Sequence, residues 1–404
     1  MIIVAAASGT SADGLDVGVV DIDWAGAEPN SGPDGGPDLE LRLLHLRTEP
    51  WPAGLGEAVL ELLPPAVTTA ARICELDTAI GQAVGAAARR AIRESDTDVE
   101  LVVSPGQTVH HEVRDGECLG TLQIGQPAWV VEATGLPVVS DLRARDVSAG
   151  GHGAPLASTL DALWLAAAGG HTAALNLGGI ANVTVVGGAG EPVMAWDTGP
   201  ANCLIDIAAA RATDGLLRCD VDGAIAARGV VRSDLLDRLL AHPYFALTPP
   251  VSTGREVFSE QLLNEALAQM APIEPDDIVA TLTELTAVSV ARALRPYDVV
   301  EVVASGGGTR NPTLMEALRR ALGPTRLTTS DDRGIPADAK EVVMWALLGF
   351  LCWHGIPGST QATGARTPKV LGRISPGDEP LVLPSPAQCR PRQLRVLSSV
   401  VDRR

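Results

Sequence analysis

The feature that most constrains the fold is a repeated opening, in which a β-type apolar run, a glycine-rich turn and a second β-type run occur once in each half. In the first half, Ile2 to Ala7 precedes a turn rich in glycine and hydroxyl residues, and Val17 to Trp24 follows it. In the second half, Thr172 to Leu177 and Val183 to Val186 flank a Gly-Gly turn. Alternating strand and helix patterns with such a repeat predict two related α/β domains.

Helical periodicity fills much of the remaining chain. Apolar residues recur every three or four positions from Ile73 to Ala88, which predicts an amphipathic helix. Further helices are expected at Ser259 to Met270, Asp277 to Leu294 and Asn311 to Leu322. The Gly-, Pro- and Asp-rich stretch from Ala25 to Asp38 predicts an exposed hairpin extension. A length of 404 residues suits two or three domains, and we predict an N-terminal domain over 1–150 and a C-terminal domain over 151–404.

Charge and composition exclude several partners. The chain has 31 basic and 49 acidic residues, a net charge of −18, and no basic stripe, so we expect neither nucleic acid nor an anionic membrane as a partner. No apolar stretch reaches the roughly 20 residues of a membrane-spanning helix. The apolar start lacks a positive flank and predicts a strand rather than a signal peptide. Six scattered cysteines without a C-x-x-C pair predict reduced thiols. We therefore expect a cytoplasmic protein.

Three segments that follow strand-like runs are candidate phosphate-binding turns. The first consists of Gly9, Thr10, Ser11, Ala12, Asp13, Gly14, Leu15 and Asp16, the second of Asp197, Thr198 and Gly199, and the third of Gly306, Gly307 and Gly308. Small residues let backbone N–H groups converge on an anion, and hydroxyls add donors. Asp13 and Asp197 are candidates to hold Mg²⁺ through water. A tight hairpin for the first segment and a plain turn for the second are the alternatives.

Known single-loop nucleotide motifs are absent. The sequence has neither G-x-x-x-x-G-K-[ST] nor G-x-G-x-x-G, which disfavours P-loop and Rossmann sites. Several separate turns suit a nucleotide held between two domains instead. The stretch from Asn176 to Asn182, which is the turn of the second hairpin, is a fourth glycine- and hydroxyl-rich turn that follows a strand-like run.

Asp146 is the candidate acid–base residue. It closes the segment from Ser140 to Asp146 and precedes the glycine-rich loop from Ala149 to Pro155, where a carboxylate can be exposed and aimed. Arg143 and Arg145 add positive charge to this part of a strongly acidic chain. A solvated charge pair beside a loop is the alternative interpretation.

Taken together, these residues resemble the anhydro-N-acetylmuramic acid kinase family. The matching stretches lie in order over nearly the whole chain: GTSADGLD from Gly9, GQTV from Gly106, QIG-PA around Gln123 to Ala128, SDLRARD from Ser140, AGGHGAPL from Ala149, NLGGIANVT from Asn176, WDTGPANCLID from Trp196, SGGGTRNPTLM from Ser305, GIPADAKE from Gly334 and TGA near Thr363. Each stretch is short, but their common order makes the match specific.

The resemblance implies the fold and the roles of individual residues. The implied fold is α/β, with two RNase H-like domains of the actin/hexokinase/Hsp70 superfold flanking an ATP cleft. By the resemblance, Gly9 to Asp16 form the first phosphate loop, Asp197 to Gly199 the second, and Gly306 to Gly308 the adenosine-side loop. Asp146 matches the catalytic base, and Glu341, Gln107 and Thr108 lie on the sugar side.

The implied reaction uses ATP and Mg²⁺. The family opens the 1,6-anhydro ring of its sugar with water and phosphorylates O6, giving N-acetylmuramate 6-phosphate in peptidoglycan recycling. The expected partners are thus this sugar and ATP, and a homodimer is left open.

Two departures from the family pattern lie on the sugar side. Pro105 stands where members carry a histidine, and Gln126 replaces an acid. A kinase of the same fold for another sugar is therefore one alternative function. A nucleotide-gated switch protein is another, although such a switch would not need an aimed base at Asp146.

Overall fold

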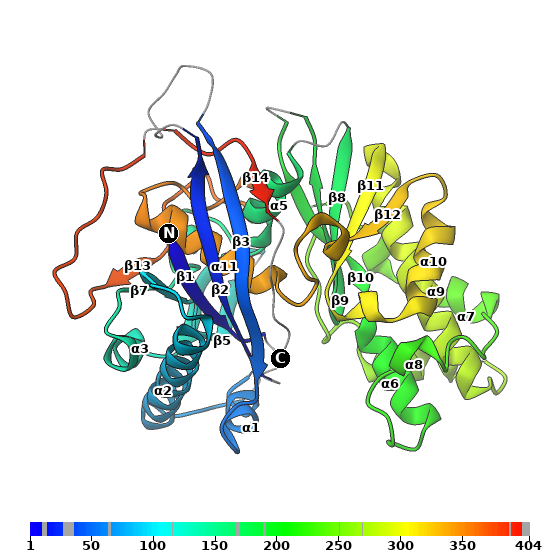
Figure 1. The fold of residues 1–404 in the computed structure, drawn as a ribbon. Coiled ribbons are helices and arrows are strands. Elements are labelled where there is room, and N and C mark those ends of the chain that lie inside the picture. Colours follow the sequence, from blue (N-terminus) through cyan, green and yellow to red (C-terminus); the bar gives the residue numbers. More distant parts are fainter. Residues whose placement is uncertain are drawn as a thin grey trace. The chain divides into compact units, whose positions relative to one another are not determined.

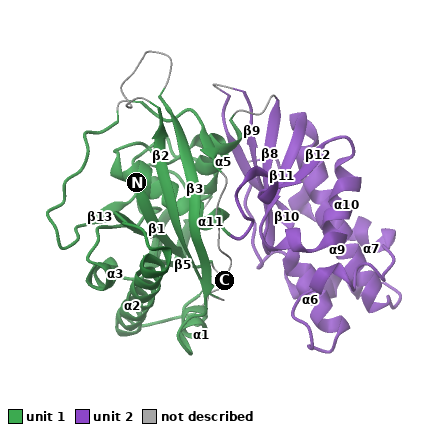
Figure 2. Ribbon diagram, in the orientation of Figure 1, with its two compact units in different colours: residues 1–167, 339–404 green, residues 168–338 purple. Residues whose placement is uncertain are grey.

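Two mixed β-sheets organise the structure, which is a computed structural model (Figure 1). It describes residues 1–9, 14–26, 36–63, 66–114, 116–166, 170–188, 191–249, 251–268, 270–387 and 389–397. Contacts divide the chain into two units, one of residues 1–167 and 339–404 and the other of residues 168–338 (Figure 2). Each sheet belongs to one unit.

The sheet of the first unit contains the first predicted hairpin. Its strands are β1 (Ile2–Ala7), β2 (Leu15–Ala25), β3 (Asp38–Glu49), β4 (Leu101–Ser104), β7 (Val138–Ser140), β13 (Arg373–Ser375) and β14 (Leu394–Val396), in the order β13-β7-β4-β1-β2-β3-β14. Strands β1, β2 and β3 pair antiparallel, whereas β4 lies parallel to β1 and β7 parallel to β4. The β2–β3 pairing reaches Ala25 and Asp38, so the predicted extension joins two paired strands; residues 27–35 lie outside the described part.

Helices cover both faces of this sheet. The unit contains α1 (Leu55–Leu60), α2 (Ala70–Ser95), α3 (Pro127–Thr134), α4 (Ala144–Ser148), α5 (Ala157–Leu165) and α11 (Lys340–Trp353), together with the hairpin β5 (Gln107–Arg114) and β6 (Glu117–Ile124). The predicted periodic helix is α2, which packs with Val17 and Val19 of β2. Gly18 points to the opposite face, because side chains alternate along a strand, and it contacts Val342 of α11.

The second unit repeats the strand arrangement. Its strands are β8 (His171–Leu177), β9 (Ile180–Val186), β10 (Met194–Pro200), β11 (Val299–Ser305) and β12 (Arg326–Thr329), in the order β10-β9-β8-β11-β12. Strands β8, β9 and β10 pair antiparallel, and β11 lies parallel to β8 and to β12. This order and these directions match β3-β2-β1-β4-β7 of the first unit.

The helices of the second unit are α6 (Asn202–Ala212), α7 (Ser233–Leu240), α8 (Glu260–Leu267), α9 (Pro275–Leu294) and α10 (Pro312–Leu322). Three of them, α8, α9 and α10, confirm the sequence predictions, and two more, α6 and α7, were not predicted. Asn311 caps α10 by accepting a hydrogen bond from the Leu314 N–H, which explains where the predicted helix begins. Helices α9 and α10 pack with the sheet in one apolar cluster that includes Val183, Val290 and Leu314.

The predicted domain boundary differs from the observed division. Residues 151–167 remain in the first unit, and residues 339–404 return to it instead of ending the second. The physical reason is that α11 covers the first sheet: Gly349 lies so close to Val103 of β4 that a Cβ there would approach it to 2.2 Å. The periodicity of a helix shows that it has an apolar face but not which sheet that face covers.

Two further predictions concern the chain as a whole. All six cysteines are free thiols, as expected. Within the described ranges, no helix is both long and apolar enough to cross a membrane.

Candidate active site

Asp146 lies on the short helix α4, shortly after the end of strand β7. Its side chain is completely buried. The Thr363 hydroxyl donates to Oδ1 over 2.8 Å, and the Gly153 N–H donates to Oδ2 over 2.8 Å. Burial raises the pKa of the Asp146 carboxyl, although these two hydrogen bonds act in the opposite direction. The expectation of an exposed carboxylate is therefore wrong, but the glycine-rich loop does contact it.

The loop that follows α4 fits closely around the carboxylate. A Cβ on Gly151 would lie 2.2 Å from Asp146 Oδ2, so only glycine leaves room for the acid at this position. Gly153 has a φ of +67°, a conformation that glycine adopts without strain, and this turn directs its N–H to the carboxylate. The glycines thus serve to enclose and orient one carboxylate.

Arg143 connects this loop to α11. Its Nη1 donates to the Gly153 carbonyl over 2.7 Å, and its guanidinium carbon lies 5.1 Å from the centre of the Trp345 ring. Trp345 Nε1 donates to Glu341 Oε1 over 3.3 Å, one turn earlier on the same helix. Arg143, Trp345 and Glu341 therefore form a connected group beside the Asp146 loop.

Glu341 has conflicting electrostatic surroundings. The Glu341 residue is exposed to solvent, yet desolvation by the surrounding protein raises the pKa of its carboxyl group. The negative charge of Asp16 raises this pKa further. Arg143 and the Trp345 hydrogen bond oppose this rise. Because solvent reaches Glu341, we expect the rise to be limited. The interactions nevertheless place Glu341 near both Arg143 and Asp16.

Gln107 contacts the start of the first candidate phosphate turn. It is buried, and its Nε2 donates to the Gly9 carbonyl over 3.3 Å, while its Oε1 is buried without a hydrogen-bond partner in the described structure. Thr108 accepts a hydrogen bond from Gln123. Asp16, at the start of β2, accepts a hydrogen bond from the Thr48 hydroxyl of β3. Thr10, Ser11, Ala12 and Asp13 lie outside the described residues.

The second candidate turn is not a turn. Asp197, Thr198 and Gly199 lie within β10, at a register shift between Asp197 and Gly199, so the expectation of a loop at this position is corrected. The sequence Asp-Thr-Gly-Pro has a composition typical of turns, but pairing with β9 keeps these residues in the strand. Burial raises the pKa of Asp197 to about 6, and Glu256 adds to this rise. The Thr253 N–H donates to Asp197 Oδ2 over 2.8 Å and opposes it.

A row of polar residues crosses the second sheet beside Asp197. Asp197 pairs with Asn182, Asn182 with Asn176, and Asn176 with Ser305. Residues directly paired on neighbouring strands point to the same face of a sheet. The row therefore brings a carboxylate, two amides and a hydroxyl onto one face of the second unit.

The third glycine segment meets the β8–β9 turn at one end of this row. A Cβ on Gly306 would lie 2.6 Å from Asn176 Oδ1, and a Cβ on Gly308 would lie 2.7 Å from the Leu177 Cβ. Asn202, at the start of α6, donates through Nδ2 to the carbonyls of Leu177 and Gly178. Two glycine-rich segments that are far apart in sequence are thus brought together.

Sequence reasoning missed part of this second site. The glycines of the β8–β9 turn, Gly178 and Gly179, correspond in topology to the β1–β2 turn that contains the first candidate phosphate segment. The repeated hairpin was the signal that could have identified them. Arg255 carried no comparable signal, because its proximity to the turn depends on the packing of the segment before α8.

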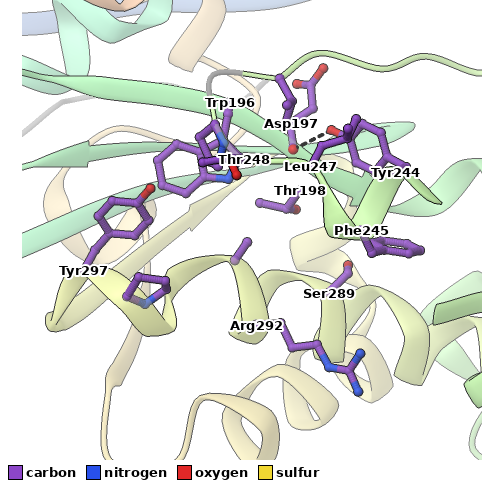
Figure 3. Close-up of a pocket in the computed structure, with 14 residues that line it drawn as sticks. Trp196, Asp197, Thr198, Tyr244, Phe245, Leu247, Thr248, Ser289, Arg292 and Tyr297 are labelled. Atoms are coloured by element: carbon purple, nitrogen blue, oxygen red, sulfur yellow. Dashed lines mark hydrogen bonds between the residues drawn. The ribbon is translucent and has the colours of Figure 1, made fainter. Parts of the chain in front are cut away.

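A cavity of about 350 Å³ lies beside β10, and Trp196, Asp197 and Thr198 of that strand contribute to its lining (Figure 3). The lining mixes polar residues with aromatic ones, among them Tyr244, Phe245 and Tyr297. Tyr244 donates through its hydroxyl to the Asp197 carbonyl over 2.6 Å, which fixes the strand at this point.

Metal ligands are sparse in the described part of the protein. It contains no group of three or more His, Cys, Asp or Glu side chains that could hold a metal ion. Asp197 offers one carboxylate oxygen beyond the one that accepts from Thr253. Such a site suits Mg²⁺ that is held mainly by phosphates and water, because Mg²⁺ usually keeps several waters and takes only one or two carboxylates.

The strand order defines the class of the protein. A five-strand core in the order 3-2-1-4-5, with only the second strand antiparallel to the rest, occurs in both units and is the RNase H-like arrangement. Two such units in one chain are the architecture of the actin/hexokinase/Hsp70 superfold. Among solved structures, the ROK hexokinase from Thermus thermophilus matches 87% of this chain and 99% of its own, with 17% identity and a TM-score of 0.36.

Sequence comparisons identify the family within this class. The family model described as anhydro-N-acetylmuramic acid kinase matches residues 1–377. A protein of that name from Streptomyces avermitilis is 51% identical over 96% of this chain and 97% of its own length. A protein of the same name from Rhodococcus erythropolis is 46% identical over 96% of this chain and 98% of its own length. The chain belongs to the anhydro-N-acetylmuramic acid kinase family.

Proposed function

We propose that the protein uses ATP to convert 1,6-anhydro-N-acetylmuramic acid and water to N-acetylmuramate 6-phosphate and ADP, a reaction that returns cell-wall sugar to metabolism. The observation that carries this proposal is the buried Asp146 carboxylate, fixed by Thr363 and Gly153 and enclosed by a glycine loop, in a member of this kinase family.

Asp146 would act as the general base. Its carboxylate accepts hydrogen bonds from the Thr363 hydroxyl and the Gly153 N–H, and Ser359 also interacts with it. A carboxylate has about four lone-pair sites, so one remains that can accept a proton from water. The activated water attacks the anomeric carbon, the bond from that carbon to O6 breaks, and O6 attacks the γ-phosphate. The phosphoryl group captures O6, so no separate acid is required. Because Asp146 is buried, this role requires the adjoining loop to admit the water.

Positive charge and donors near Asp146 would orient the sugar. Arg143 is held by the Gly153 carbonyl and the Trp345 ring, and the sugar side of the site also includes Glu341, Gln107 and Thr108. The unpartnered Oε1 of Gln107 is an acceptor for a substrate hydroxyl or amide N–H. These residues supply directional contacts rather than proton transfer.

Glycine-rich segments would bind the nucleotide. In the second unit, we assign the phosphates to the β8–β9 turn and the adenosine side to Gly306, Gly307 and Gly308. In the first unit, the family resemblance assigns a phosphate loop to the turn from Gly9 to Asp16, of which residues 10–13 lie outside the described part. Asp197, Thr198 and Gly199 would support the second phosphate turn through the pairing of β10 with β9. Mg²⁺, when bound, neutralises charge on the phosphates; in the second unit, Asp197 would hold it through water.

Purified protein tests the proposal with a panel of sugars. Incubation with ATP and Mg²⁺ should release ADP with 1,6-anhydro-N-acetylmuramic acid and yield a product heavier than the sugar by one water and one phosphoryl group. ADP release only with an open sugar would assign the protein to another substrate, which Pro105 and Gln126 make the main alternative. ADP release at the same rate without sugar would contradict the kinase function.

A further inference from the structure

Arg255 lies against the glycine turn between β8 and β9. A Cβ on Gly179 would come within 2.9 Å of Arg255 Nε and 3.0 Å of Nη2. The guanidinium can approach this closely only because residue 179 has no side chain. The backbone of the β8–β9 turn and the Arg255 guanidinium therefore lie next to each other.

No pairing with a described residue explains the position of Arg255. It forms no hydrogen bond or ion pair with any residue that the structure describes, although Asp206 on α6 is near enough to interact with it electrostatically. The side chain is exposed to solvent. In a chain with a net charge of −18, an arginine without a paired carboxylate at a glycine turn is available to an external anion.

Two hydrogen bonds made by Asp197 fix the segment that precedes Arg255 to β10. The Asp197 N–H donates to the Val251 carbonyl over 3.0 Å, and the Asp197 carboxylate accepts from the Thr253 N–H over 2.8 Å. Beyond Arg255, the Phe258 side chain is buried, with its ring 5.4 Å from that of Tyr244. These anchors hold Arg255 near the turn before any ligand binds.

We propose that Arg255 binds the phosphate groups of the nucleotide at the β8–β9 turn and positions them for transfer. The planar guanidinium provides two parallel N–H donors to phosphate oxygens, which matches the geometry of a phosphate better than an ammonium does. Asp197 acts through this arginine, because it fixes the segment from Val251 to Arg255. This inference rests on the proposed use of ATP.

The test compares how variants bind ligands with and without phosphate. Isothermal titration would measure the affinity of the full-length protein for adenosine, ADP and a non-hydrolysable ATP analogue. Arg255→Gln should weaken binding of ADP and of the analogue about tenfold or more, the loss expected for one charge-assisted contact, and leave adenosine affinity within about twofold. Arg255→Lys should retain part of the phosphate affinity. Arg319→Gln, which changes an exposed arginine on α10, is the matched control and should change none of the three affinities.

Each alternative outcome has a defined meaning. An equal loss for adenosine and ADP would show that Arg255 only supports the fold, and unchanged ADP affinity would show that it contacts no phosphate; either result overturns the inference. If wild-type protein binds the analogue but Arg255→Gln binds it equally well, only this inference fails. If wild-type protein binds none of the three ligands, the proposed function fails with it.

Discussion

At the scale of single residues, the environment of Asp146 determines its chemistry. A carboxylate in water has too little basicity to activate water well, and burial moves the pKa of Asp146 in the useful direction. The Thr363 hydroxyl and the Gly153 N–H limit this rise, because hydrogen bonds to a carboxylate stabilise its ionised form. The two hydrogen bonds also fix the orientation of the carboxylate.

Asp146→Asn should therefore abolish most turnover while nucleotide affinity stays nearly unchanged. The amide cannot accept the proton from water, and loss of a general base costs about 10²- to 10⁴-fold in kcat. Steady-state kinetics and nucleotide titration measure the two effects. Asp141→Asn is the control, since Asp141 faces Arg373 at 3.5 Å in a partly exposed ion pair. If Asp141→Asn abolished turnover and Asp146→Asn did not, the base would be misassigned.

Thr363→Val should change the pH dependence of the reaction. The base must be deprotonated, so kcat/KM falls as the pH falls through the pKa of Asp146. Removing the Thr363 hydroxyl removes a hydrogen bond that lowers this pKa, and the acid limb of the profile should move to higher pH. Ser148→Ala, which removes a hydroxyl bonded to the Arg145 carbonyl on the same short helix, should leave the limb in place. A shift to lower pH would contradict the role given to Thr363.

At the scale of elements, the loop after α4 can pack against Asp146 only because Gly151 has no Cβ atom. Gly151→Ala would place a Cβ 2.2 Å from Asp146 Oδ2, and the carboxylate or the loop must move. We expect a loss of kcat of at least about tenfold, because small misplacement of a catalytic group is costly. Gly120→Ala is the matched control, since its Cβ would meet nothing closer than 3.9 Å. Wild-type kinetics in Gly151→Ala would show that this loop does not position the base.

Helices α5 and α11 are joined by a buried ion pair between Asp161 and Lys340. The Asp161 side chain is 2% exposed and the Lys340 side chain 11% exposed, and Lys340 Nζ lies 2.8 Å from Asp161 Oδ1. The angles at these atoms do not meet the criteria of a hydrogen bond, so the interaction is an ion pair. Lys340→Met would leave Asp161 buried without its partner and should lower the free energy of unfolding of this part by about 3 kcal/mol or more, as measured by chemical denaturation.

Two further variants make this stability prediction specific. Lys340→Met combined with Asp161→Leu should recover most of the loss, because no charge then remains buried. Arg114→Met removes an exposed partner of Glu112 and should cost at most about 1 kcal/mol. Equal effects of Lys340→Met and Arg114→Met would contradict the distinction between buried and exposed pairs.

At the scale of the whole molecule, local patterns predicted most elements but not their assembly. The repeated hairpin and the periodic apolar residues of α2 are local, and the structure confirms them. The return of α11 to the first sheet depends on contacts at Gly18 and Gly349, which no local pattern specifies.

The same limit applies to the candidate site. Asp146 and its glycine loop are close in sequence and were found, although the burial of the carboxylate was not. Thr363 reaches Asp146, and Arg255 reaches Gly179, only through tertiary packing. The residues that follow Asp197 in the sequence are typical of a turn, but pairing between β9 and β10 keeps this segment in a strand.

The central claim is that ring opening by water and phosphoryl transfer to O6 occur in one reaction on this protein. A single turnover in ¹⁸O-water, stopped with borohydride to prevent exchange at the anomeric carbon, tests it most directly by mass spectrometry. The account predicts one ¹⁸O atom on the anomeric carbon of the sugar phosphate and none in its phosphoryl group. ¹⁸O in free inorganic phosphate, with no labelled sugar phosphate formed, would show that water attacks phosphorus instead and would contradict the account.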